Sequence, residues 1–125
     1  MSVLKDFYQV QSKQQVSEHL HLVALTINGH HEIFKGHFPG NPVTPGVCMM
    51  QIVKDLAEEI FNKKLVLVTA NNVKFMAIIN PEETPELTLE LEIVENNDEI
   101  KVKNTTKFGE TIALKMSVQY KIQPS

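Results

Sequence analysis

Only one stretch of this chain has the periodicity of a helix, and strand-like segments lie on both sides of it. The helical stretch runs from about residue 45 to 62 and follows Thr44-Pro45. A hydroxyl residue at the cap and a proline at the first helical position favour helix initiation. Polar residues, Gln51 and Asp55 among them, fall on one side. On a 3.6-residue period the apolar side chains share the other: Met49, Met50, Val53, Leu56, Ala57, Ile60 and Phe61.

The segments around the helix alternate between apolar and polar residues, as strands with one buried face do. Such segments are residues 18–28, 65–69, 71–79, 87–94, 99–107 and 111–122. Gly109 provides a turn between the last two. One helix followed by a run of antiparallel strands predicts an α+β fold, and a sheet curled around the helix would bury its apolar stripe.

Length and composition narrow the possible roles. The 125 residues predict a single domain spanning 1–125. A net charge of −3 and a pI near 5.9 argue against a general nucleic-acid or membrane-surface binder. Cys48, the one cysteine, favours a reducing compartment. With neither a signal-peptide core nor the roughly 20 apolar residues of a membrane span, the chain is expected in the cytoplasm.

The segment with chemical potential is the loop that runs into the helix, G-H-F-P-G-N-P-V-T-P-G-V from Gly36 to Val47. Three prolines restrict its path, and its glycines permit tight turns. The first helical amides, those of Gly46, Val47 and Cys48, have no intrahelical acceptor and are predicted to bind a carbonyl oxygen or an anion. A base such as His37 beside these donors suits proton abstraction next to a carbonyl. A purely structural or solvated loop histidine is the competing interpretation.

This loop resembles the signature of the 3-hydroxyacyl-[acyl-carrier-protein] dehydratases of fatty acid synthesis. N-V-K-F from Asn72 and N-P-E from Asn80 resemble the family's next segment. The resemblance implies a hotdog fold, a homodimer or a multiple of it with active sites between subunits, and an acyl carrier protein as partner. It implies that His37 is the base and that the Gly46 amide binds the thioester oxygen.

The chain departs from the family on the helix. The family places an acidic residue fourteen positions after the histidine, on the helix of the partner subunit, and a Gln four residues later. Here the order is reversed, with Gln51 first and Asp55 second. The two side chains share a helix face. Asp55 is a candidate substitute for the missing acid, the pair together could hold a water, or Asp55 could belong to a solvated face with Glu58 and Glu59.

Two further departures concern the N-terminus and the carrier protein. The segment from Asp6 to Val10 does not match the His-Arg-Tyr-Pro-Phe-like stretch of bacterial members. After the helix the family is more basic, whereas Lys74 is the one lysine that remains in the Lys74–Ala77 stretch.

Three functions are compatible with these residues. The first is dehydration of 3-hydroxyacyl thioesters on a carrier protein, with no metal and no redox cofactor because only a proton and water move. The acyl chain would lie beside Phe38, Val47 and the strand that carries Phe75. The second is a non-catalytic module that binds the acyl chain or its carrier, or one half of a heterodimer. The third is a hotdog thioesterase.

Overall fold

The chain folds into one curved antiparallel sheet with a helix on one face. The computed structural model describes residues 6–35 and 42–124. The strands are β1 (Tyr8–Gln15), β2 (Leu20–Ile27), β3 (Leu65–Phe75), β4 (Glu86–Asn96), β5 (Glu99–Phe108) and β6 (Thr111–Ile122). The helices are the 3₁₀ turn η1 (Glu32–Lys35) and α1 (Gly46–Phe61). The α+β prediction is confirmed.

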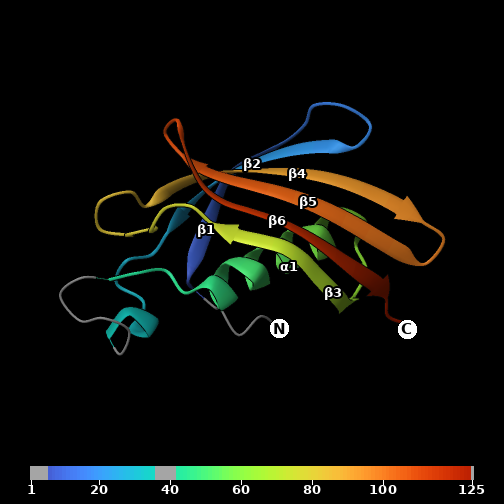
Figure 1. Ribbon diagram of the computed structural model, residues 1–125, viewed down its shortest axis with the longest axis horizontal. Helices are drawn as coiled ribbons and strands as arrows, with labels where there is room; N and C mark the ends of the chain where they lie inside the picture. The colour runs from blue at the N-terminus through green and yellow to red at the C-terminus, as the bar shows by residue number, and fades with distance from the viewer. Residues whose placement is uncertain (1–5, 36–41, 125) are drawn as a thin grey trace.

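The strands lie in the order β1-β2-β4-β5-β6-β3, so β1 and β3 are the two edges. All five neighbouring pairs are antiparallel. β3 follows the helix in sequence yet pairs with the last strand, which brings the chain back across the helix (Figure 1). The sheet therefore wraps α1, with an open edge on either side of it.

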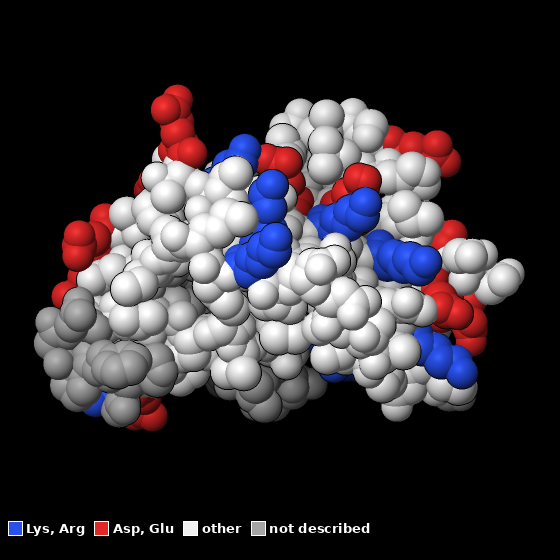
Figure 2. Space-filling view, in the orientation of Figure 1, with Lys and Arg blue, Asp and Glu red and all other residues white. Residues whose placement is uncertain are grey.

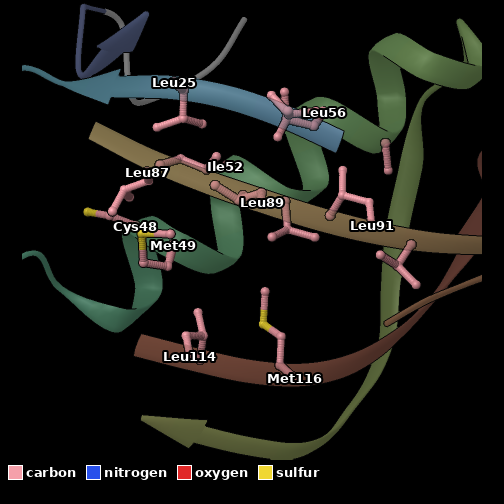
Figure 3. Packing of buried hydrophobic residues seen from close by; sticks show 14 of the residues in the cluster. Leu25, Cys48, Met49, Ile52, Leu56, Leu87, Leu89, Leu91, Leu114 and Met116 are labelled. Atoms are coloured by element: carbon pink, nitrogen blue, oxygen red, sulfur yellow. The ribbon is translucent and has the colours of Figure 1, made fainter. Parts of the chain in front are cut away.

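The core fills the space between the sheet and α1. Leu25, Leu89, Leu91, Leu114 and Met116 project from strands β2, β4 and β6 towards the helix (Figure 3), and all are almost fully buried. The helix side chains that meet them are Cys48, Met49, Ile52, Val53, Leu56 and Ala57. Burial of apolar surface at this interface supplies most of the driving force for folding.

The buried helix face is rotated from the predicted one. Cys48 and Ile52 belong to it, whereas Met50, Ile60 and Phe61 lie at its margin. The predicted Thr44 cap is wrong: Pro45 is the N-cap residue, with an extended backbone, and no side chain caps the helix. Proline donates no hydrogen bond, and its extended conformation turns the chain directly into the helix.

The sheet also differs from the prediction at its edges. Residues 65–69 and 71–79 are not two strands, because β3 runs unbroken to Phe75 and ends there. Its pairing with β6 shifts between Asn71 and Lys74, where Asn72 has a positive φ of 53°. Such a bulge adds a residue without ending the strand. β1 was not predicted: most of its residues are exposed, so no alternation marks it.

Candidate active site at the start of the central helix

The N-terminus of α1 presents two backbone amides that have no acceptor among the described residues. The Cys48 amide donates to the Pro45 carbonyl over 3.0 Å, so the prediction that it is free is wrong. For the Gly46 and Val47 amides, no acceptor is found within the described part of the chain. Two adjacent N–H groups at a helix N-terminus form a site that favours a carbonyl oxygen or an anion.

A cleft of about 380 Å³ adjoins these amides. Its walls are mostly apolar: Val43, Thr44, Pro45, Gly46, Val47, Phe75, Ala77, Ile78 and Ile79. Phe75 lies against Gly46 so closely that a Cβ on Gly46 would stand 2.7 Å from the ring Cζ. Gly46, Val47 and Phe75, which were predicted from the sequence to belong to one site, thus lie together in the structure.

One polar atom at this cleft has no hydrogen-bond partner. Thr44 is 5% exposed, and its Oγ1 bonds to nothing within the part of the chain that the structure describes. Its backbone is well fixed, because the Thr44 amide donates to the Ile79 carbonyl over 2.9 Å. A buried hydroxyl without a partner is costly, so this position is a local exception to normal polar pairing.

The reversed pair on the helix is joined by a hydrogen bond. Gln51 Nε2 donates to Asp55 Oδ1 over 2.9 Å. The other carboxylate oxygen, Oδ2, accepts a hydrogen bond of 3.2 Å from the hydroxyl of Tyr8. Asp55 is therefore half-buried between its own helix and strand β1, and its surroundings differ from those of a fully solvated carboxylate.

Sequence reasoning missed Tyr8, which lies 47 residues from Asp55 in an unpredicted strand. Burial raises the pKa of the Tyr8 hydroxyl well above its usual range, and the negative charge of Asp55 adds to this effect. The hydroxyl is therefore protonated near neutral pH and acts as a donor.

The neighbouring helix carboxylates have separate partners. Glu58 accepts a hydrogen bond from the Leu65 amide over 2.9 Å, which ties the start of β3 to the helix. Glu59 pairs with Lys13 of β1 at 3.0 Å on the exposed surface. Asp55 is thus distinguished from both by its contacts with a tyrosine and a glutamine.

A second, smaller cleft of about 270 Å³ lies between α1 and strands β3 and β6. It is lined by Val47, Met50, Gln51, Lys54, Leu67 and Tyr120. Val47 also lines the first cleft and is 74% exposed, so the two clefts meet at this residue. Gln51 therefore lines a cleft that shares one residue with the cleft at the open amides.

Strand β3 exposes apolar side chains at the edge of the sheet. Val66, Leu67 and Val68 are 49%, 44% and 57% exposed. Figure 2 shows that the surface over β3 is mostly uncharged, with Lys side chains above it on the sheet. An apolar edge strand with unpaired backbone groups is suited to pairing with another strand.

His37 and Phe38, the predicted base and one predicted wall of the substrate pocket, lie outside the described residues. Within residues 6–35 and 42–124, no cluster of His, Cys, Asp or Glu could hold a metal ion. In the same ranges, no helix is long and apolar enough to cross a bilayer.

Comparison with known proteins identifies the family. The model of the ApeI-like family, described as ApeI dehydratase, matches residues 12–118 of this chain. The chain belongs to the ApeI-like dehydratase family. The match begins within β1 and ends within β6, and it includes the whole of α1 and every residue that lines the first cleft.

Individual relatives agree with this membership. The chain is similar to the 3-hydroxyacyl-[acyl-carrier-protein] dehydratase FabZ of Clostridium acetobutylicum, with 35% identity over 66% of this chain and 57% of the relative. FabZ of Pediococcus pentosaceus is also 35% identical, over 72% of this chain and 58% of the relative. The chain therefore spans less than two thirds of the length of these relatives.

The fold has a close counterpart among solved structures. The structure described as the dehydratase heterocomplex ApeI:P from Xenorhabdus doucetiae superposes with a TM-score of 0.73, covering 90% of this chain and 96% of that one at 19% identity. This similarity confirms the predicted hotdog fold, an antiparallel sheet around a central helix.

Proposed function

We propose that this ApeI-like family member removes water from 3-hydroxyacyl thioesters carried by an acyl carrier protein. The observation that carries the proposal is the pair of open amides at Gly46 and Val47, which face an apolar cleft. Donors in a dry site stabilise the negative charge that develops on a thioester oxygen when the neighbouring carbon loses a proton. Membership of a dehydratase family and similarity to FabZ support the same reaction.

In the proposed reaction His37 takes the proton from C2 of the acyl chain. The electrons of that C–H bond form the C2–C3 double bond as the C3–oxygen bond breaks. The proton then passes to the departing hydroxyl, which leaves as water, so no net proton is gained or lost. The Gly46 amide binds the thioester oxygen, and Gln51 with Asp55 positions the 3-hydroxyl. Phe38, Val47 and Phe75 form the apolar walls.

We further propose that the active protein is a homodimer built on β3. Pairing of two β3 edges would cover Val66, Leu67 and Val68 and would bring two central helices together. His37 and Gly46 of one subunit would then act with the Gln51–Asp55 pair of the other. The related structure is described as a heterocomplex, so pairing with a different hotdog subunit is the competing outcome. We place the reaction in the cytoplasm, which suits the free, buried Cys48.

The test is an assay with short and medium 3-hydroxyacyl-pantetheine thioesters, read for both enoyl product and free thiol. Dehydration gives enoyl absorbance without thiol, whereas a thioesterase gives thiol. His37→Ala should reduce the rate of enoyl formation by a factor on the order of 10² to 10⁴, which is the usual contribution of a positioned general base. His30→Ala is the matched control, because His30 is an exposed loop histidine. Thiol without enoyl, or His37→Ala with wild-type activity, would contradict the proposal.

A further inference from the structure

The hydrogen bonds around Asp55 fix the orientation of the Gln51 amide. A carboxylate accepts hydrogen bonds and cannot donate them, so the nitrogen of the Gln51 amide must face Asp55. The carbonyl oxygen, Oε1, is bonded to the same carbon and therefore points to the other side. Within the described part of the chain, no donor contacts this oxygen. Gln51 thus has an unused acceptor and lines the cleft between α1 and β3.

Tyr8 holds the carboxylate from the far side. Its hydroxyl donates to Oδ2 of Asp55, while Gln51 donates to Oδ1, so the two oxygens are held separately. Tyr8 is fixed by the sheet and not by the helix, because it pairs with Ile27 in the β1–β2 ladder. Asp55 is therefore held between a strand and its own helix. Because the Gln51 amide donates to this fixed carboxylate, the orientation of the amide is fixed as well.

We infer that Tyr8 and Asp55 are positioning residues that hold the Gln51 carbonyl oxygen towards the substrate, where it accepts a hydrogen bond from the 3-hydroxyl of the acyl chain. This inference rests on the proposed function and assigns the substrate contact to Gln51 alone. The reversed order of amide and acid is then a working arrangement: the amide touches the substrate, and the acid orients the amide.

A Gln51 carbonyl oxygen turned towards the substrate would discriminate between 3-hydroxyacyl and 3-oxoacyl chains. A 3-hydroxyl group donates a hydrogen bond, whereas a 3-oxo group only accepts. A carbonyl oxygen on Gln51 favours the first and repels the second, because two acceptors would face each other. Sites built to bond a hydroxyl discriminate against analogues that lack the donor. The protein should therefore bind 3-hydroxyacyl chains in preference to 3-oxoacyl chains of the same length.

The experiment compares the Kd of two stable analogues, the 3-hydroxyacyl- and 3-oxoacyl-pantetheine amides of one chain length. Wild type should prefer the hydroxy analogue by on the order of 5-fold or more, the value of one net hydrogen bond. Gln51→Leu removes the acceptor and should abolish the preference. Asp55→Asn should make the Kd values of the two analogues nearly equal. An asparagine amide both donates and accepts hydrogen bonds, so it leaves the Gln51 amide free to turn. Tyr8→Phe should reduce the preference for the hydroxy analogue.

Lys13→Gln is the matched control. It breaks another contact between β1 and α1, the ion pair with Glu59, without touching Asp55. It should keep the wild-type ratio. Should Tyr8→Phe fail to fold, Asp55→Asn, which changes a half-buried surface residue, carries the test by itself.

The outcomes separate the two proposals. If wild type binds both analogues equally, or if Asp55→Asn and Gln51→Leu keep the full preference, the inference is overturned while the dehydratase proposal stands. If wild type binds neither analogue and forms no enoyl product, the proposed function fails, and the inference fails with it.

Discussion

The ring of Phe75 occupies the space in which any side chain on Gly46 would have to lie, with Cζ 2.7 Å from the position of a Cβ. The two residues come from different elements, the first turn of α1 and the end of β3. Glycine at position 46 therefore allows the Phe75 ring to lie in this place, and the reason is a close contact and not the backbone angles. Both residues also line the cleft at the open amides.

Gly46→Ala should fold, because Phe75 is 52% exposed and its ring can move. The displaced ring would reshape the cleft, and dehydratase activity should fall by on the order of 10², as it does when reacting groups are misplaced by about 1 Å. Adding Phe75→Leu to Gly46→Ala should restore part of that loss. Steady-state kinetics of the single and double variants check this, and equal activity of Gly46→Ala and wild type would contradict it.

Thr44→Val should make the protein more stable. Valine has nearly the same shape as threonine but lacks the hydroxyl that is buried without a partner. Removing such a group gains about 1 kcal/mol in the free energy of unfolding. Urea denaturation measures the change, with Thr44→Ser, which keeps the hydroxyl, as the control. A loss of stability in Thr44→Val would show that the hydroxyl has a partner in solution.

The stability of the protein should decline as the pH rises above about 10. Burial is the main cause that raises the pKa of both Tyr8 and Tyr120 well above the usual tyrosine value of about 10, so folding favours their protonated forms. A raised pKa in the folded state gives stability that is complete below the unfolded value and is lost as the pH rises towards the folded value. Denaturation curves from pH 8 to 11 should show this decline, and Tyr8→Phe should make it shallower.

Leu67→Lys should separate the proposed dimer. Leu67 lies on the edge strand β3, and a lysine there places charge in an apolar pairing surface. Light scattering at micromolar concentration should then give the monomer mass, whereas wild type gives the dimer. Val94→Lys is the matched control: Val94 is similarly exposed, at 41%, but lies on the interior strand β4. A wild-type monomer would contradict the shared-site proposal.

The sequence predicted those elements in which one buried face makes the apolar residues repeat at a regular interval. The helix and strands β4, β5 and β6 each have one buried and one exposed face, so their apolar residues repeat at 3.6 or 2 residues. β1 has no such repeat, because it is a polar edge strand rich in glutamine. β3 is likewise mostly exposed and its register with β6 shifts twice, so its pattern is not continuous and one strand resembled two.

The candidate site was predictable only in part for a related reason. Gly46, Val47 and Phe75 belong to segments that resemble a known family, so their proximity was expected from that resemblance. The contact between Tyr8 and Asp55 spans 47 residues and depends on where an unpredicted strand lies. No local pattern encodes a contact of this kind. The orientation of the Gln51 amide follows from that contact and was equally inaccessible.

In the proposed dimer, the apolar edge strand β3 is covered only after two chains have met. A newly made subunit presents an apolar strand with unpaired backbone groups, which is a template for any extended chain that it meets. A chain that has not yet paired also lacks the stability that a partner contributes, and chaperones and proteases act on the unfolded fraction of such a chain. Under the proposed pairing, the amount of this protein depends on how fast it finds a partner as well as on its rate of synthesis, and overproducing it alone should lead to inclusion bodies if the partner is a different chain.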